Sequence, residues 1–114
     1  MQTCDFCQIR DGALPARIVH WDENVLAFED TRPQAPVHVL FIPLEHVETA
    51  NDFSPQDATR IGQLFLAATQ VAKDRGYRER GYRLVLNCNR DAGQSVFHVH
   101  LHLLAGRHMR WPPG

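Results

Sequence analysis

Several features that define large protein classes are missing from this sequence of 114 residues. Its apolar runs are far shorter than the roughly 20 residues of a membrane-spanning helix, so no membrane association is expected. The net charge is −1 with neutral histidines, which provides no basic surface for a nucleic-acid partner. Only three cysteines are present, and an odd number argues against a disulfide framework. The N-terminus has no basic stretch followed by an apolar segment, so we expect no signal peptide and a cytoplasmic location.

Length and patterning favour one domain over residues 1–114, without repeats or linkers. Alternating and β-branched residues predict strands near residues 17–21, 25–30, 38–44, 81–88 and 96–104. Apolar residues spaced three and four apart predict a helix over residues 55–75, with Ser54 as its N-cap and Gly76 after its end. We expect an antiparallel sheet with this helix on one face, which is the α+β class. The expected apolar face of the helix comprises Ala58, Ile61, Leu64, Phe65, Ala68, Val71 and Ala72.

Three of the seven histidines, His98, His100 and His102, occupy alternate positions in the last predicted strand. Side chains alternate between the two faces of a strand, so the three imidazoles are expected on one face. The intervening apolar residues should pack against the helix from the other face; they are Phe97, Val99, Leu101 and Leu103.

Such a row of imidazoles has three explanations. The first is a half-exposed strand whose polar positions happen to be histidine. The second is a metal site, although four residues of strand span roughly 13 Å, so one ion reaches only two of the three rings. The third is phosphoryl chemistry, in which a neutral imidazole attacks phosphorus while its neighbours donate hydrogen bonds. This explanation gives every histidine a role, and the preceding loop adds the Gly93 amide and the Ser95 hydroxyl as donors to an anion.

The segment HVHLHLL resembles the His-φ-His-φ-His-φ-φ signature of the histidine triad (HIT) superfamily. Similarity to its Hint branch, the histidine triad nucleotide-binding proteins, extends through CDFCQI, DTRPQAPVHVLFIPLEH, GYRLVLN and GQSVFHVHLHLLAGRHMRWPPG. The resemblance implies a HIT-like fold, a five-stranded antiparallel sheet with one long helix. It also implies an enzyme that hydrolyses purine nucleoside 5′-phosphoramidates, the conjugates of AMP or GMP with an amine, through a covalent nucleotidyl-histidine intermediate. This reaction requires no cofactor.

The same resemblance assigns catalytic roles to four histidines. The middle histidine, His100, is the nucleophile. His102 contacts the α-phosphate and helps to transfer a proton at the leaving group, and His98 orients the site. His38 matches a fourth histidine that completes a relay, although in isolation it would be a surface histidine at the start of a strand.

Nucleotide contacts follow from the resemblance in the same way. Asp30 matches a carboxylate that binds both ribose hydroxyls, as two oxygens can accept from adjacent donors. In isolation it would equally be a turn former. The wall around the base is expected from Phe6, Ile9 and Leu14, and the phosphate and sugar contacts from Asn87, Gly93 and Ser95. The family forms a homodimer with one continuous ten-stranded sheet, and its Trp-Pro-Pro tail, here beginning at Trp111, reaches the partner's site.

Two of the cysteines are candidate ligands of a zinc site. Cys4 and Cys7 form a C-x-x-C pair, which is half of a structural zinc site. Some bacterial members of the superfamily complete such a site with two histidines, and by resemblance these are His46 and His98. The alternative is a pair of small buried thiols, because relatives close to the animal form function without metal.

Three other functions remain open from the sequence. One is cleavage of dinucleoside polyphosphates, the activity of the fragile-histidine branch. Another is nucleotide-binding regulation with incidental hydrolysis, and a third is a zinc-dependent scaffold.

Overall fold

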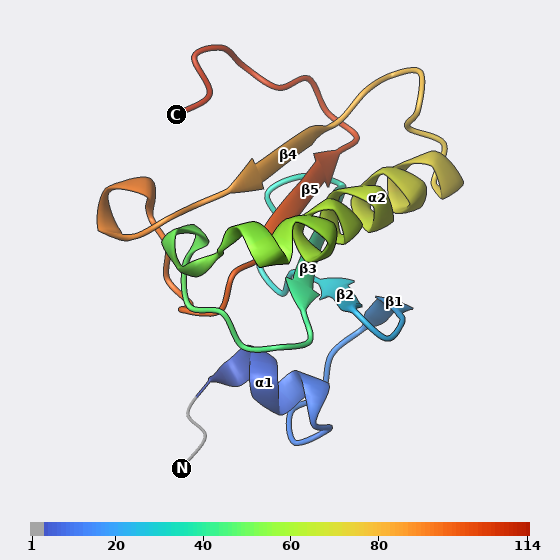
Figure 1. Ribbon diagram of the computed structural model, residues 1–114. Helices are drawn as coiled ribbons and strands as arrows, with labels where there is room; N and C mark the ends of the chain where they lie inside the picture. Colours follow the sequence, from blue (N-terminus) through green and yellow to red (C-terminus); the bar gives the residue numbers. More distant parts are fainter. Residues whose placement is uncertain (1–3) are drawn as a thin grey trace.

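The computed structural model describes residues 4–114. Residues 1–3 lie outside the described part, and so does the beginning of the N-terminal stretch in which no signal peptide is expected. A five-stranded antiparallel sheet in the order β1-β2-β3-β5-β4 forms the centre of the molecule (Figure 1). The α+β class and the expected fold, five strands with one long helix, are therefore confirmed. The strands are β1 (Ile18–Trp21), β2 (Val25–Glu29), β3 (Val37–Pro43), β4 (Arg83–Leu86) and β5 (Leu101–Ala105).

The long helix α2 (Ala58–Asp74) crosses one face of the sheet and packs mainly on β3 and β5 (Figure 1). A 3₁₀ turn, Pro55–Asp57, leads into it. Ser54 and Asp57 form the reciprocal capping box that the sequence predicts, with the Ser54 N–H donating to Asp57 Oδ2 at 2.9 Å. Gly76 follows the helix with φ +86°, a left-handed conformation that only glycine adopts without strain.

The buried face of α2 differs in part from the expected one. Ala58 and Phe65 are exposed, and Ile61 is only half-buried. Phe65 follows the fully buried Leu64, and one residue turns the side chain about 100° around the helix axis. The buried stripe therefore runs through Leu64, Ala67, Ala68, Val71 and Ala72.

A short helix, α1 (Asp5–Arg10), was not predicted from the sequence. It lies at the opposite end of the molecule from the C-terminal tail (Figure 1). The Cys4 side chain caps it by accepting the Cys7 N–H at 3.3 Å, so the helix begins at an unusual capping residue. Its Phe6 closes a second apolar cluster, on the face of the sheet that α2 does not cover, with Leu26, Phe28, Leu40 and Ile42.

The predicted strand over residues 96–104 is wrong in its first half, because β5 begins only at Leu101. The ladder between β3 and β5 starts at the pair Phe41–Leu101, and β3 ends two residues later at Pro43, which has no N–H to donate. Residues 96–100 therefore run as irregular chain into the sheet, with the Val99 N–H bonded to the Val47 carbonyl at 2.7 Å.

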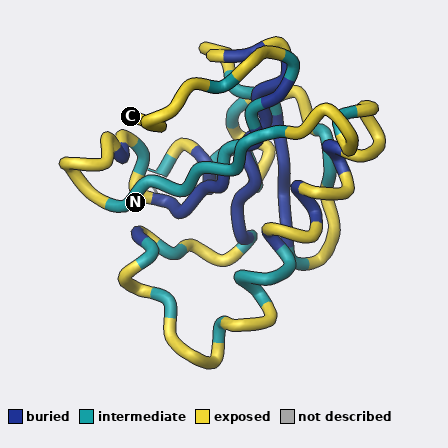
Figure 2. The backbone as a smooth tube through the Cα atoms, turned by 90° about the horizontal axis from the view of Figure 1, so that it is seen from above, coloured by how far each residue is buried: buried dark blue, intermediate teal, exposed yellow. Residues whose placement is uncertain are grey.

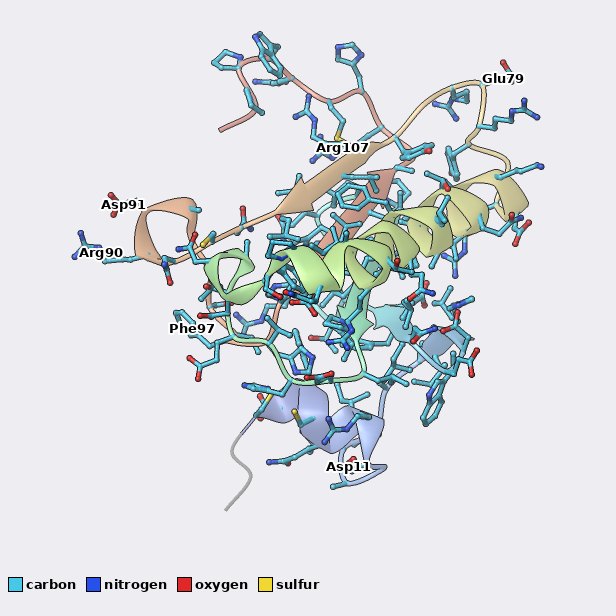
Figure 3. All side chains as sticks on the ribbon, viewed as in Figure 1. Asp11, Glu79, Arg90, Asp91, Phe97 and Arg107 are labelled. Atoms are coloured by element: carbon cyan, nitrogen blue, oxygen red, sulfur yellow. The ribbon has the colours of Figure 1, made fainter. Side chains whose placement is uncertain are left out.

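The alternation of apolar and imidazole side chains nevertheless continues through this irregular segment. Val99, Leu101 and Leu103 are buried in the cluster beneath α2, as predicted. Phe97 is the exception: it precedes β5, is 45% exposed and lies at the periphery of the molecule (Figure 3). Among the regular elements, burial is concentrated in β2, β3, β5 and one stripe of α2, whereas the tail after Gly106 is largely exposed (Figure 2). No helix within residues 4–114 is long and apolar enough to cross a membrane.

Candidate active site

A cavity of about 580 Å³ opens between α1, the end of β2 and the segment before β5. It has both an apolar wall and converging polar groups, the combination typical of small-molecule sites. Seven residues singled out from the sequence line it: Phe6, Ile9, Leu14, Asp30, Ser95, His100 and His102.

The ring of His100 is held with one nitrogen free to react. Its Nδ1 lies 2.8 Å from the His98 carbonyl oxygen, which can only accept, so Nδ1 carries the proton. The lone pair is then on Nε2. The Phe6 ring stands edge-on to the imidazole at 5.1 Å between centroids. Burial lowers the pKa of His100, which keeps the ring neutral and nucleophilic at neutral pH.

A second histidine pair sets the proton position on His102. The Gln34 N–H donates to His38 Nδ1 at 3.0 Å, so the His38 proton is on Nε2. That Nε2–H lies 2.9 Å from His102 Nδ1, which must accept. His102 therefore carries its proton on Nε2. Among the buried side-chain nitrogens and oxygens of residues 4–114, His102 Nε2 is the one without a hydrogen-bond partner. A buried donor without a partner, on a residue that lines the cavity, is available to a ligand.

Burial keeps this pair neutral. Burial lowers the pKa of His102 to about 4. The nearby His100 and His38 rings lower this pKa further, whereas the Asp30 carboxylate raises it. Burial also lowers the pKa of His38, against the Asp30 carboxylate. The site thus presents neutral imidazoles near pH 7.

The shifted pKa of His102 predicts a pH dependence of stability. An unfolded histidine titrates near pH 6.5, so between about pH 6.5 and pH 4 the unfolded chain binds a proton that the folded chain does not. The stabilisation is complete above this window and is lost as the pH falls through it. We expect His102 to contribute a decrease on the order of 3 kcal/mol in the free energy of unfolding. Urea unfolding at pH 7.5, 6 and 5 should show a shallower decrease for His102→Gln, whereas a variant at the exposed tail residue, His108→Gln, should follow the wild type. Equal slopes for both variants would contradict the assignment.

Loop 89–95, between β4 and the histidine segment, is fixed by Gln94, which the sequence analysis did not single out. Its Oε1 accepts the Asn89 N–H at 2.8 Å, and its Nε2 donates to the carbonyls of Glu48 at 2.8 Å and Val96 at 3.0 Å. The buried amide therefore ties this loop to the one that carries His46. Arg90 and Asp91 project outward from the loop tip (Figure 3). A signal for Gln94 was its place in GQS, next to Ser95.

Several predicted residues do not line the cavity in this chain. Asn87 follows the end of β4, Gly93 caps a 3₁₀ turn with φ +83°, and Trp111 is 82% exposed in the tail. Their nucleotide contacts stay predictions. His98 is fully buried and its ring does not reach the cavity either; it acts on the site through its backbone carbonyl, the acceptor for His100.

Cys4, Cys7, His46 and His98 converge in a second cluster, in which one ligand atom from each lies within 4.8 Å of the others. His98 Nε2 donates to the Pro43 carbonyl at 2.9 Å, so its Nδ1 is a lone pair directed at the other three residues. Its Nδ1 lies 3.4 Å from each sulfur and 3.2 Å from His46 Nδ1, and Cys7 Sγ lies 3.3 Å from His46 Nδ1.

These separations fit tetrahedral zinc. Zinc bonds of about 2.3 Å to sulfur and about 2.0 Å to nitrogen place S and N roughly 3.5 Å apart and two N atoms roughly 3.3 Å apart. Burial, with Cys4 nearby, raises the pKa of Cys7 to about 11, so the free thiol keeps its proton and a metal would displace it. A zinc ion here would cross-link α1, the loop after β3 and the segment before β5.

Comparison with known proteins agrees with the fold and the histidine arrangement. The HIT domain family model matches residues 11–109. The chain is 46% identical over 109 residues to an uncharacterised HIT-like protein of Synechocystis, covering 96% of this chain and 95% of that protein. It is 43% identical over 102 residues to the purine nucleoside phosphoramidase of Escherichia coli, covering 90% and 86%.

Solved structures of HIT family hydrolases share the fold of this chain. A HIT family hydrolase from Legionella pneumophila superposes with a TM-score of 0.96 at 49% identity, covering 98% of this chain and all of the other. One from Clostridium thermocellum gives 0.93 at 44% identity, covering 96% of both. The family match, the sheet topology and the hydrogen-bonded pair of His38 and His102 agree, and this chain belongs to the HIT domain family.

Proposed function

We propose that the protein hydrolyses purine nucleoside 5′-phosphoramidates through a covalent nucleotidyl-histidine intermediate. The observation that carries the proposal is the free Nε2 lone pair of His100 on the cavity wall, fixed by the His98 carbonyl. The name of the Escherichia coli relative, purine nucleoside phosphoramidase, supports the substrate class.

The reaction divides into two displacements at phosphorus. His100 Nε2 forms a bond to phosphorus as the P–N bond to the amine breaks, and the amine leaves with the proton from His102 Nε2. The net charge is unchanged: the nucleotidyl-imidazole of His100 becomes a cation, while the neutral His102 loses its Nε2 proton and becomes an anion that the His38 Nε2–H stabilises at 2.9 Å. Water then attacks phosphorus, the bond to His100 breaks, and the water proton restores His102. The products are a 5′-mononucleotide and a free amine.

The cavity offers a place for each part of such a substrate. Phe6, Ile9 and Leu14 supply the apolar wall for a purine, and the Asp30 carboxylate on the same cavity suits the ribose hydroxyls. Ser95 lies close enough to share this cavity with the two reacting histidines and is the proposed donor to the phosphate.

Substrate comparison tests the proposal. We expect turnover of an adenosine 5′-phosphoramidate to exceed turnover of a diadenosine polyphosphate by at least about 100-fold in kcat/KM, as a difference in transition-state binding. The reverse order would favour the dinucleoside polyphosphate hydrolase. Tight binding of AMP by calorimetry with negligible turnover of both would favour a nucleotide-binding regulator.

We further propose a homodimer in which two sheets join along β4. Support comes from the outer edge of β4, which within residues 4–114 pairs with β5 alone, and from the exposed apolar Phe65 and Leu66 on α2. In such a dimer the exposed Trp111 tail can reach the second site.

Disrupting that surface should give monomers. Leu66→Lys places a charge where the proposed interface is apolar, and we expect analytical ultracentrifugation to show a mass near 13 kDa instead of twice that value. Trp21→Lys, a matched change at the exposed outer strand β1, should leave the mass unchanged. A monomeric wild type would contradict the dimer, and equal effects of both variants would contradict the β4 side.

A further inference from the structure

We propose that Asp30 is a positioning residue for the reaction in addition to its ribose contact: its carboxylate selects the tautomer of His38 and, through it, directs the His102 Nε2–H at the substrate. The inference rests on the proposed function and adds to it a role for Asp30 in orienting the proton donor His102. Asp30, His38 and His102 form a cluster whose ligand atoms lie within 4.8 Å of one another.

Asp30 is anchored beside His38 by the backbone and by its own side chain. The Asp30 N–H donates to the His38 carbonyl at 3.0 Å. Its Oδ1 accepts the Arg32 N–H at 2.8 Å and closes the turn after β2, while Oδ2 lies 3.4 Å from His38 Nε2. The carboxylate is 20% exposed and the His38 side chain 4%, so the pair is largely shielded from solvent. Electrostatic attraction at such a site is stronger than in bulk water.

The carboxylate favours the proton on His38 Nε2, since a positive N–H end then faces a negative oxygen. In the other tautomer the Nε2 lone pair would face Asp30 Oδ2 at the same 3.4 Å, and the Nδ1 proton would face the Gln34 N–H. Both contacts are repulsive. Asp30 and the Gln34 amide therefore select the same tautomer from opposite sides of the ring.

The tautomer of His38 decides that of His102. Only when His38 Nε2 donates does His102 Nδ1 accept at 2.9 Å, which places the remaining proton on the unpartnered Nε2. Asp30 lines the cavity while His38 does not, so a single carboxylate serves both the sugar and the relay. Roughly four lone-pair sites on a carboxylate leave room for both.

A substrate without the ribose hydroxyls separates the two roles. On 2′,3′-dideoxyadenosine 5′-phosphoramidate, Asp30 has no hydroxyl to bind, so a pure ribose contact predicts equal kcat for the wild type and Asp30→Asn. We expect instead that kcat falls about tenfold or more, part of the 10²–10⁴-fold typical of a positioned proton donor. The Asp30→Asn variant keeps an oxygen that can accept the Arg32 N–H. If this variant does not fold, Asp30→Ser, which keeps a shorter acceptor, replaces it in the test.

The second readout is the tautomer itself, from imidazole ¹⁵N shifts of the resting protein. We expect His102 in the Nε2–H form in the wild type and a mixture in Asp30→Asn. The matched control is Asp22→Asn, another turn aspartate that faces an imidazole, with Oδ2 2.6 Å from His20 Nε2 outside the cavity; it should change neither readout. An unchanged kcat on the dideoxy substrate, or an unchanged tautomer, overturns the proposal. If the wild type turns over no phosphoramidate, the proposed function has failed, and the ¹⁵N measurement, which needs no substrate, still decides whether Asp30 sets the tautomer.

Discussion

Replacing His100 with alanine is expected to lower kcat for an adenosine 5′-phosphoramidate by about 10⁴-fold or more, the scale of losing a covalent nucleophile. The reason is geometric: His100 has the free Nε2 on the cavity wall, whereas His102 Nε2 carries a proton and the His98 ring is turned toward the cysteines. No neighbouring imidazole can substitute for it.

Two measurements check this result. Quenched wild-type reactions should contain a nucleotidyl adduct on the peptide that carries His100, located by mass spectrometry, and His100→Ala should lack it. His20→Ala, a histidine on β1 that pairs with Asp22, should keep wild-type turnover. An adduct on another residue, or substantial activity in His100→Ala, would remove the mechanism.

Zinc removal is expected to lower the melting temperature by on the order of 10–20 °C. A ligand held at about 1,000 times its Kd stabilises the native state by roughly 4 kcal/mol, and each kcal/mol moves the midpoint of a domain of this size by about 4 °C. The effect follows from the cluster of Cys4, Cys7, His46 and His98, which joins three separate segments of chain.

Metal analysis by mass spectrometry, with thermal melts before and after a chelator, provides the test. We expect one zinc per chain, and we expect Cys7→Ser to lose both the metal and the chelator response. Cys88→Ser is the matched control, as Cys88 lies outside the cluster and should keep both. A wild type that contains no zinc after expression in zinc-supplemented medium would contradict the site.

Elements with strong local signals could be predicted from the sequence. The helix over residues 55–75 has a capping box, a three–four apolar spacing and a terminal glycine, and only its first turn and the position of Phe65 differed. The short helix α1 could not be found, since its six residues contain too little periodicity and its cap is a cysteine. Its position is decided by tertiary contacts, chiefly Phe6 against Phe28 and the His100 ring.

The site shows the same division between local and long-range information. The alternate spacing of the triad predicts which side chains share a face, and two of the three rings do line the cavity. The separate task of the His98 ring depends on Cys7, 91 residues earlier in the chain, and the proton position on His102 depends on His38, 64 residues away. The periodicity of a sequence predicts which side chains of one strand or helix share a face, whereas Cys7 and His38 lie in other segments of the chain.

The position of α1 separates the residues proposed to recognise the base from those proposed to react at phosphorus. Phe6 and Ile9 on α1 and Leu14 just after it form the apolar wall proposed for the base, whereas the imidazoles proposed to react come from the other end of the chain. Varying Ile9 and Leu14, with both cysteines retained and Phe6 kept against the His100 ring, should let laboratory evolution change the purine preference without rebuilding the phosphorus chemistry. The residues of the apolar wall can thus change in sequence at a different rate from the histidines within one small fold.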